Sequence, residues 1–581
     1  MNNNTEKYTN NTNSDSTIRA LVLLVEFNDV RFSINEPVTA FNNLINSYGY
    51  SYNGATGSVK DYFNANFYNF NNFEFDVSNV ITLKSDMAKY GAATSSANDI
   101  DAKQMVVDAC KTAYENGIDF SIYDCNKDGV VDNVHIIYAG YSHSCGGPTD
   151  AIWAHQWTIE DKNISYNGVS LASYSCSSEL RGNSDTLINS IGSFCHEYLH
   201  SWGLIDMYDT NQETEGLSNA LYGNLSIMDN GYELNQGNTP PFLNAIEREQ
   251  LSIVEIIDIE PNKEYSLFPI NISGKIGRIK TNTEGEYFLL ECRSMHKWDK
   301  YIGGEGLIIY HIDKSDNIYG DISAIKRWEF NNVNAFASHE CAKVVVASNP
   351  SNGSISSIFF PGTSNVTSIK SSGGESRLLD WNGRPVGVAL ENITFKNNKV
   401  CFKSVEDYTF SQEAPVAKNI SAIEYQESAR IKWECDSASQ NLKWRIVLKD
   451  LSNNALSEHI AHSTQHVIKN LESGAKYNLT INSLSNLICG AEVPFSFSTV
   501  DTTSLYPHIF VKDEYKANET IDLRVFNISE PYRKVLWKIN GQNIYTDYYV
   551  IPNETSEIEI IATILYKDGT NEKIYKTIFV Q

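Results

Sequence analysis

The stretch from Ser193 to Asp209 contains side chains whose types and spacing suit metal chemistry. It reads SFCHEYLHSWGLIDMYD and places His196 and His200 four positions apart, with Glu197 directly after the first histidine. Residues four apart lie on the same face of a helix, so the two imidazoles can bind one metal ion together. Glu197 then points to the flank where a water molecule would be activated. This HExxH spacing is typical of a zinc peptidase site.

Two further residues extend the pattern past the helix. We expect the helix to end at Gly203, because glycine adopts the left-handed conformation that turns the chain sharply. The turn would bring Asp206 back toward the same ion as a third ligand. Cys195 precedes His196 directly. Neighbours on a helix do not face each other, so we interpret Cys195 as buried packing and not as a nucleophile.

A second candidate metal site lies between Tyr123 and Val134, in the stretch YDCNKDGVVDNV. The match to an EF-hand loop fails at position twelve, where His135 replaces a bidentate Glu, and the loop leads into an apparent strand. The alternative is a polar turn at Asp128 and Gly129. We favour a structural calcium site. Its oxygen donors would match positions one to nine of the loop: Asp124, Asn126, Asp128, the backbone carbonyl of Val130, and Asp132.

The length and the net charge of the chain limit the classes of function that it can have. The chain has 581 residues, which is too long for one core, and 41% of them are hydrophobic. Its 46 basic and 71 acidic residues give a net charge of -25, which repels phosphate backbones and anionic membranes. We therefore expect no nucleic-acid partner. The sequence contains no apolar run of 18 residues, so we also expect no transmembrane segment.

Neither the first residues nor the cysteines provide a clear compartment signal. Residues 1–17 are polar and lack the apolar segment of a secretory signal, so we expect a flexible tail. If the protein is exported, we expect its signal to be absent from this sequence. The ten cysteines form no CxxC pair, which excludes a zinc ribbon and a dense disulfide scaffold.

Hydrophobic patterns ahead of the histidines predict an α/β domain with a mixed sheet. His155, between two tryptophans, is interpreted as a packed residue and not as a ligand. The helix that carries the histidines is predicted to begin near Asp185. The other predicted elements are strands at 18–27, 73–83, 151–159 and 167–174, a turn at Asn167 and Gly168, and helices at 57–69, 98–116 and 240–252.

Downstream of the histidines, the stretch SIMDNG contains Met228. A lone methionine is usually core filler, but at this distance it also fits the Met-turn that lies beneath the metal in metzincins. Tyr232, four positions later, is a candidate donor to the oxyanion.

A series of ordered motifs extends over roughly residues 18–405. They are ATGSVKDYF (55–63), DFSIYDCNKDGVVD (119–132), IIYAGY (136–141), IWAHQW (152–157), HEYLHSWGLIDMYD (196–209), SIMDNG (226–231), FLNAIEREQL (242–251), EGEYFLLECR (284–293) and GGEGLIIYHID (303–313). Together these motifs resemble the immune inhibitor A family of secreted bacterial zinc metallopeptidases. The resemblance implies that His196, His200 and Asp206 bind zinc and that Glu197 is the general base. One departure is Leu199, where such motifs often have glycine; it faces away from the metal.

The rest of the chain is predicted to be all-β. Seven short strands between 415 and 500, with Trp433 and the segment ending at Tyr477, resemble a fibronectin type III domain, whose tyrosine corner Tyr477 would make. Trp537 and an Asn540-Gly541 turn indicate an Ig-like sandwich after it. The predicted domains are a tail at 1–17, a metzincin-like catalytic domain at 18–255, and β-sandwich domains at 256–408, 409–500 and 501–581.

These features predict a secreted or cell-surface zinc endopeptidase with catalytic zinc, structural calcium, and protein or peptide substrates. One alternative is a surface adhesin or carbohydrate-binding protein with an inactive peptidase scaffold. Another is a purely structural zinc site, although such sites usually close the fourth position with Cys or His. The C-terminal β-domains are either spacers or binders of a surface or glycan ligand. Chelator-sensitive digestion of casein would separate the peptidase from the adhesin.

Overall fold

The structure is a computed structural model, and the chain divides into two compact units, Met1–Thr409 and Phe410–Gln581. The polar tail predicted at 1–17 lies outside the described residues, apart from Thr17. The described residues are 17–67, 72–93, 98–184, 186–211, 217–319, 322–350, 354–372, 374, 376–410, 414–425, 427–435, 442–485, 488–500, 507–512, 514–528, 531–553 and 556–580.

A mixed sheet forms the centre of the first part of unit 1, as predicted. Its strand order is β2-β1-β4-β8-β5, and all neighbours are parallel except β5, which runs antiparallel at the edge. β1 is buried on both faces, which suits its run of Val, Leu and Ile. The strands are β1 (Thr17–Glu26), β2 (Asn72–Thr82), β4 (Val134–Tyr138), β5 (His155–Thr158) and β8 (Ser173–Ser178).

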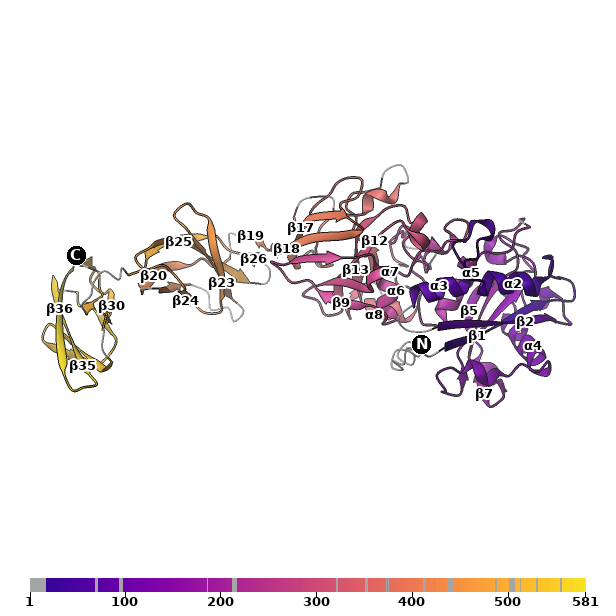
Figure 1. Cartoon of the computed structure of the whole chain (residues 1–581), viewed down its shortest axis with the longest axis horizontal. Helices are drawn as coiled ribbons and strands as arrows, with labels where there is room; N and C mark the ends of the chain where they lie inside the picture. The colour runs from indigo at the N-terminus through magenta and orange to yellow at the C-terminus, as the bar shows by residue number, and fades with distance from the viewer. Residues whose placement is uncertain are drawn as a thin grey trace. The chain divides into compact units, whose positions relative to one another are not determined.

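Helices cover both faces of this sheet (Figure 1). Val22 and Leu24 of β1 share a core with the helices α2 (Pro37–Asn46), α3 (Val59–Asn66) and α5 (Ile191–His200). Leu21 and Leu23 point the other way and share a core with α4 (Ala102–Glu115). Successive side chains of a strand point to opposite faces, so the apolar run of β1 contributes to two cores.

The predicted helices at 57–69 and 98–116 are present but start later, at their capping residues. Ser58 forms a capping box with Asp61 ahead of α3, and the Asp101 side chain accepts a hydrogen bond from Gln104 ahead of α4. The helix predicted to begin near Asp185, which lies outside the described residues, begins instead at Ile191. Residues before it pair with the chain after β8, where the Asn189 amide donates to the carbonyl oxygen of Glu179 at 2.7 Å.

The segment predicted as one strand at 167–174 forms two, since β7 (Val169–Leu171) belongs to a small sheet with β3 (Val130–Val131) and β6 (Ser165–Tyr166). Asn167 and Gly168, both at positive φ, make the predicted two-residue turn, which joins β6 to β7. The strand predicted at 151–159 is limited to β5.

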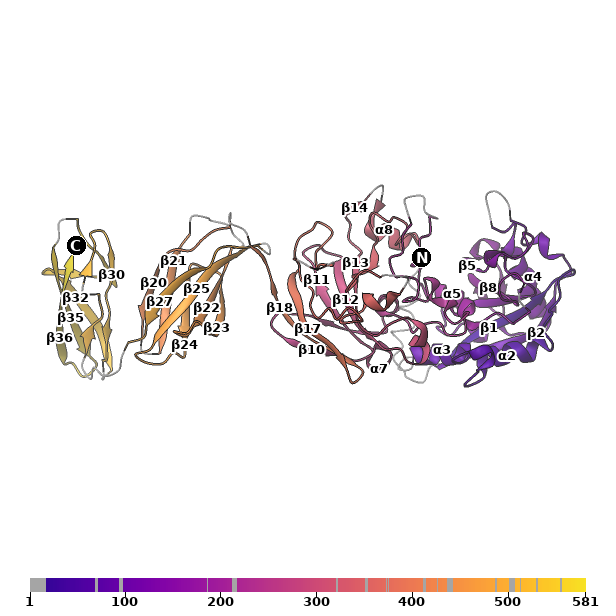
Figure 2. The ribbon, with the colours of Figure 1, turned by 90° about the horizontal axis from the view of Figure 1, so that it is seen from above.

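A second β-rich part of unit 1 shares its core with the first. Leu289, Ile308 and Tyr310 pack into the same hydrophobic core as α5 and α6 (Ala245–Gln250), which corresponds to the helix predicted at 240–252. One core therefore spans both sides of the division predicted between residues 255 and 256. The sheet that supplies these residues has the order β16-β13-β12-β11-β9. Its strands are β9 (Glu255–Asp258), β11 (Lys275–Lys280), β12 (Glu286–Arg293), β13 (Gly306–Asp313) and β16 (Ala342–Val344). Figure 2 shows its strands β11, β12 and β13.

The opposite face of this sheet packs on a second sheet of order β10-β18-β17, with Leu290, Ile309 and Phe402 in the core between them. The remaining α-helices and strands in the described part of unit 1 are β10 (Glu264–Leu267), α7 (Ile270–Ser273), β14 (Ile318–Tyr319), β15 (Ile322–Ser323), α8 (Ala324–Glu329), β17 (Gly387–Lys396), β18 (Lys399–Asp407) and the start of β19 (Thr409–Phe410).

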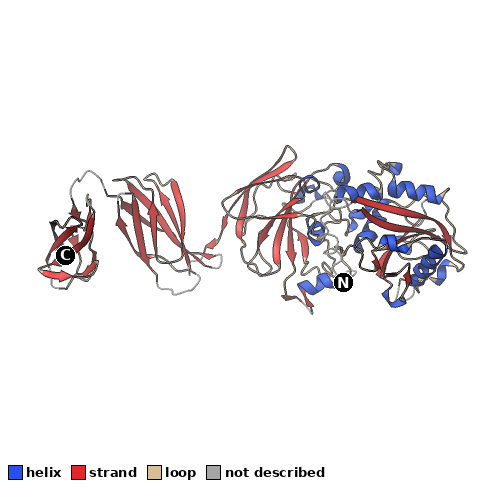
Figure 3. Cartoon of the chain, turned by 60° about the horizontal axis from the view of Figure 1, so that its bottom comes forward, coloured by secondary structure: helices blue, strands red, loops and turns tan. Residues whose placement is uncertain are grey.

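The described part of unit 2 contains strands and loops (Figure 3). Residues 418–498 form two sheets, β20-β21-β24 and β26-β25-β22-β23, with β27 also paired to β25, as in a fibronectin type III sandwich. The Tyr477 hydroxyl accepts a hydrogen bond from the Glu472 amide at 2.9 Å, which is the predicted tyrosine corner. The strands are β20 (Lys418–Glu424), β21 (Ser428–Glu434), β22 (Lys443–Lys449), β23 (Ala455–Ala461), β24 (Gln465–Lys469), β25 (Lys476–Ser485), β26 (Ile488–Cys489) and β27 (Val493–Ser498).

The last strands have a separate core around Trp537 and Ile560. Asn540 and Gly541, at positive φ, form the predicted turn between β32 and β33. The main sheet has the order β29-β36-β35-β32-β33. The strands are β28 (His508–Ile509), β29 (Glu514–Tyr515), β30 (Thr520–Asp522), β31 (Val525–Phe526), β32 (Tyr532–Ile539), β33 (Gln542–Ile544), β34 (Tyr548–Val550), β35 (Glu557–Tyr566) and β36 (Asn571–Val580).

Two further properties concern compartment. Among the described residues, none of the helices is long and apolar enough to cross a membrane. The ten cysteines all lie in the described part of the chain, and each is a free thiol there.

Candidate active site

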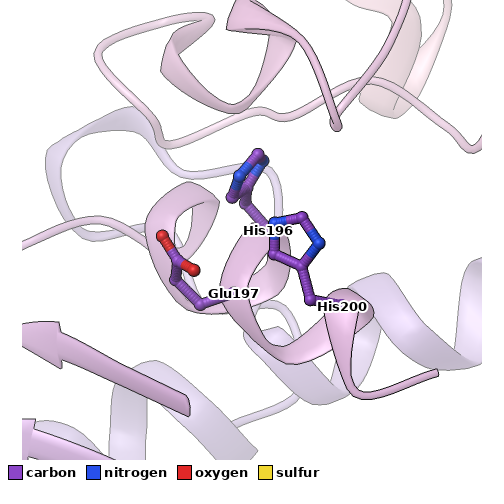
Figure 4. A group of neighbouring side chains, drawn as sticks. All are labelled: His196, Glu197 and His200. Atoms are coloured by element: carbon purple, nitrogen blue, oxygen red, sulfur yellow. The ribbon is translucent and has the colours of Figure 1, made fainter. Parts of the chain in front are cut away.

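The helix α5 carries His196, Glu197 and His200 next to one another (Figure 4). One ligand atom from each of the three side chains lies within 4.8 Å of the others. The helix is anchored at its start by Gly192, where an added Cβ would lie 1.9 Å from the carbonyl oxygen of Tyr232. Only glycine permits that approach, which holds α5 against the 3-10 helix at Asn230–Glu233.

Backbone carbonyls fix the orientation of both imidazoles. The Nδ1 of His196 lies 2.8 Å from the carbonyl oxygen of Ile227, and the Nδ1 of His200 lies 2.9 Å from that of Leu204. A carbonyl oxygen can only accept, so each Nδ1 carries a proton and donates it. Each Nε2 is therefore left to face a metal ion, which is the usual arrangement of a metal-binding histidine.

Asp206 meets the two histidines as its spacing predicts. Its Oδ1 lies 3.4 Å from the Nε2 of His196 and 3.3 Å from the Nε2 of His200. This oxygen is buried and has no hydrogen-bond partner. A buried carboxylate oxygen without a hydrogen bond is costly. A divalent cation between the three atoms would satisfy it, so these residues fit zinc.

The turn that returns Asp206 to the helix uses Gly203 at φ +91°. The Gly203 amide donates to the carbonyl oxygen of His200 at 2.9 Å, which closes the end of the helix. The predicted role of this glycine is therefore the one it has in the structure.

His196 and Asp206 shift each other's pKa. Burial favours the neutral form of His196, but Asp206 and Glu197 outweigh it and raise the pKa of His196 to about 9. Burial likewise opposes ionisation of Asp206, yet His200 and His196 hold the pKa of that carboxyl well below its usual range. The carboxylate of Asp206 is thus negatively charged and available to a cation.

Glu197 lies beside the two histidines on α5. Burial raises the pKa of its carboxyl, and the nearby His196 and His200 offset part of that increase. A glutamate whose pKa is raised toward neutrality can accept a proton from water and return it later.

Met228 is fully buried, in a turn. Its carbonyl oxygen accepts a hydrogen bond from the Met207 amide at 2.8 Å, and the preceding residue, Ile227, holds His196. The predicted Met-turn position thus links the first histidine to the segment of Asp206. The Tyr232 ring lies 4.9 Å from the His196 ring, centre to centre, so this candidate oxyanion donor is also at the site.

Two residues near the ligands are not predicted by sequence analysis. Tyr208 lies close to the carboxylates, since Asp206 and Glu197 add to burial in raising its pKa. Asn331 donates from Nδ2 to the Oδ2 of Asp206 at 2.7 Å. The sequence offers a signal for Tyr208, which lies two positions after the predicted ligand Asp206. It offers none for Asn331, because a single asparagine in a distant segment forms no motif.

His155 and Cys195 have the packing roles predicted for them. The ring nitrogens of His155 lie 2.7 Å from the Trp153 carbonyl oxygen and 2.7 Å from the Tyr174 hydroxyl. Cys195 is fully buried, and burial raises the pKa of its thiol well above the usual value.

The 124–132 loop is folded around its own carboxylates. Asp124 accepts hydrogen bonds from the amides of Asp128 at 3.0 Å and Gly129 at 2.9 Å, and Asp132 accepts one from the Cys125 amide at 3.1 Å. Within the described residues, three His, Cys, Asp or Glu side chains have ligand atoms within 4.8 Å of one another on α5, and not in this loop. The calcium site therefore stays a prediction.

The fold and the site have the features of a metallopeptidase catalytic domain. These features are the mixed sheet, the helix α5, two histidines oriented by backbone carbonyls, and Asp206 beside them. Comparison with known families agrees: the family model described as "Immune inhibitor A peptidase M6, catalytic domain" matches residues 6–248. This part of the chain is therefore similar to the catalytic domain of the immune inhibitor A peptidase M6 family.

A curated relative extends the comparison. The protein "Immune inhibitor A" of Bacillus thuringiensis subsp. alesti is 30% identical over 165 residues, covering 23% of this chain and 23% of that protein. The chain thus spans less than a quarter of the length of this relative.

Two solved structures each match less than a fifth of the chain. A fibronectin type III domain of human fibronectin type III domain containing protein 3 is 10% identical, with 16% of this chain and 91% of that chain covered and a TM-score of 0.15. Domains d3-d4 of the rat CD45 extracellular region are also 10% identical, with 17% and 55% covered and a TM-score of 0.14. At such TM-scores, the description of residues 418–498 rests on their strand order and on Tyr477.

Proposed function

We propose that this protein is a zinc-dependent endopeptidase that hydrolyses peptide bonds of extracellular proteins. The observation that carries the proposal is the convergence of the Nε2 atoms of His196 and His200 on the Oδ1 of Asp206, beside the Glu197 carboxylate. Two imidazoles and one carboxylate leave an open position on zinc, which is the pattern of a catalytic site.

His196, His200 and Asp206 would hold the zinc ion, which when bound lowers the pKa of water and polarises the peptide carbonyl. Glu197 accepts the proton of the attacking water and passes it to the leaving amine. Burial raises the pKa of Tyr232, so its hydroxyl keeps the proton that it would donate to the oxyanion.

The arrangement supports a catalytic over a structural metal. Within the described residues, no cysteine joins the group of His196, Glu197 and His200 to close a fourth position. A structural zinc site would need that closure.

The test is the substitution Glu197→Gln, which preserves size and removes the base. The variant is expected to bind one zinc ion as the wild type does and to lose cleavage of casein by a factor of about 100 or more. A chelator should abolish wild-type cleavage, and added zinc should restore it. Casein left whole by the zinc-loaded wild type would refute the proposal and favour the adhesin alternative.

The setting of the domain is also part of the proposal. We infer a secreted or cell-surface location from the resemblance to a secreted family, and calcium in the 124–132 loop in a structural role. The loop is folded around the carboxylates of Asp124 and Asp132, which supports the proposed calcium site. Substrates are proteins or peptides, and the β-modules of unit 2 are spacers or bind a surface or glycan ligand.

A further inference from the structure

Residues 331–335, with the sequence NNVNA, lie against the segment that carries Asp206. We call them the asparagine clasp. They follow α8 in the β-rich part of unit 1, outside the residues 6–248 that match the peptidase family. The clasp therefore reaches the candidate zinc site from a part of the chain beyond the recognised catalytic domain.

The first asparagine of the clasp holds Asp206 with two hydrogen bonds. The Nδ2 of Asn331 donates to the Oδ2 of Asp206 at 2.7 Å, and its Oδ1 accepts from the Asp206 amide at 2.7 Å. One side-chain amide thus fixes both the carboxylate and the backbone of the same residue. Asn331 has φ +58°, a conformation that asparagine and glycine adopt more readily than other residues.

The rest of the clasp holds the residues after Asp206. Asn334, fully buried, donates to the carbonyl oxygen of Met207 at 2.8 Å. The Thr210 hydroxyl donates to the Oδ1 of Asn332 at 3.1 Å, and the Asn211 side chain donates to the carbonyl oxygen of Ala335. The Met207 amide donates to the carbonyl oxygen of Met228. This segment is accordingly held between the clasp on one side and the Met-turn on the other.

We propose that Asn331 is a positioning residue for the third zinc ligand, so that the β-rich segment completes the metal site. The inference rests on the proposed function. With Oδ2 held by the amide of Asn331, the other oxygen of Asp206 is aimed at the two histidine Nε2 atoms. Without the amide, the carboxylate would be free to rotate, and the ordering cost would be added to zinc binding.

The decisive variant is Asn331→Gly, because glycine tolerates the positive φ and removes only the side chain. Loss of a hydrogen-bonding partner of a ligand typically weakens metal binding by a factor of about 10 to 100. We expect Asn331→Gly to bind zinc more weakly than the wild type by this factor. The zinc dissociation constant of each full chain would be measured by competition with a chromophoric chelator. The matched control is Asn332→Ala, which removes a bond to Thr210 and leaves Asp206 untouched; its zinc affinity should stay within about twofold of wild type.

Thermal unfolding of the zinc-free proteins provides the second readout. A positioning role predicts that zinc-free Asn331→Gly and Asn332→Ala unfold at similar temperatures, while zinc raises the unfolding temperature of Asn331→Gly less. Zinc affinity of Asn331→Gly within twofold of wild type would overturn the inference, and so would equal weakening by both variants. A wild type that binds zinc but cleaves no protein refutes the proposed function and leaves the clasp standing; a wild type without zinc binding overturns both.

Discussion

The Nδ1 of His200 donates a hydrogen bond to the carbonyl oxygen of Leu204 at 2.9 Å, across the turn that ends α5. The second histidine is therefore oriented by the same few residues that reverse the chain toward Asp206. One turn, centred on Gly203, therefore both orients His200 and brings Asp206 back toward the two histidines.

The first prediction concerns that glycine. At φ +91°, Gly203 has open space around its missing Cβ, so the cost of Gly203→Ala is conformational and not steric. Holding a residue other than glycine in such a conformation costs about 1–3 kcal/mol. We expect the variant to be destabilised by that amount in urea unfolding and to bind zinc more weakly, because the Leu204 carbonyl would move away from His200. Unchanged zinc affinity would show that the turn can relax without moving the ligands.

The second prediction concerns acid stability. His135 is buried between the hydroxyls of Ser175, at 2.8 Å, and Ser177, at 3.0 Å, and burial lowers its pKa from 6.5 to about 3. Between these pH values the unfolded chain binds a proton that the folded chain does not. This contribution is therefore fully present above pH 6.5 and is lost as the pH falls toward 3.

The variant His135→Gln cannot titrate there. Between pH 7.5 and 5.0, the wild type should lose about 2 kcal/mol more unfolding free energy than the variant does, measured by urea denaturation at each pH. Parallel losses in the two proteins would contradict the burial of a neutral imidazole at this position.

The third prediction concerns the extent of the folding unit. The amide of Ala245, at the start of α6, donates to Glu291 at 2.8 Å, and the Phe242 amide donates to Asp299 at 3.0 Å. A fragment that ends at residue 255 would lose both acceptors and the apolar surface of β12 and β13. We expect residues 17–255 to aggregate or to bind a hydrophobic dye, whereas residues 17–409 should unfold cooperatively in calorimetry. A sharp unfolding transition of the shorter fragment would contradict this.

The fourth prediction concerns the sandwich around Tyr477. The substitution Tyr477→Phe removes the hydroxyl that accepts the Glu472 amide and should lower the unfolding free energy of this module by about 1 kcal/mol. Peptide hydrolysis by the same protein should not change, because the site lies in unit 1. Calorimetry of the full chain, together with a peptidase assay, would measure both effects. A fall in hydrolysis would contradict the independence of the two.

Sequence analysis predicted those parts of the site that one helix and one turn define. His196 and His200 are a helical pair, and Asp206 follows through a glycine, so local geometry was sufficient. Asn331 was not predictable in this way, because it lies 125 residues from Asp206 in the chain and only tertiary packing brings them together.

The helices show the same limit. The helix α2 was not predicted, since Glu36 precedes it in a left-handed conformation and provides no side-chain cap. Periodicity predicts too early a start for α5, because it does not reveal that residues 187–189 pair with the chain after β8.

The two oxygens of Asp206 have different partners, and this difference limits the coordination number of a bound metal. Because the amide of Asn331 occupies Oδ2, the carboxylate can bind a cation in a monodentate manner through Oδ1. A bidentate carboxylate would fill a further position on the ion. His196, His200 and Asp206 would supply three donor atoms to zinc, so an ion that takes four ligands would remain open to water or substrate.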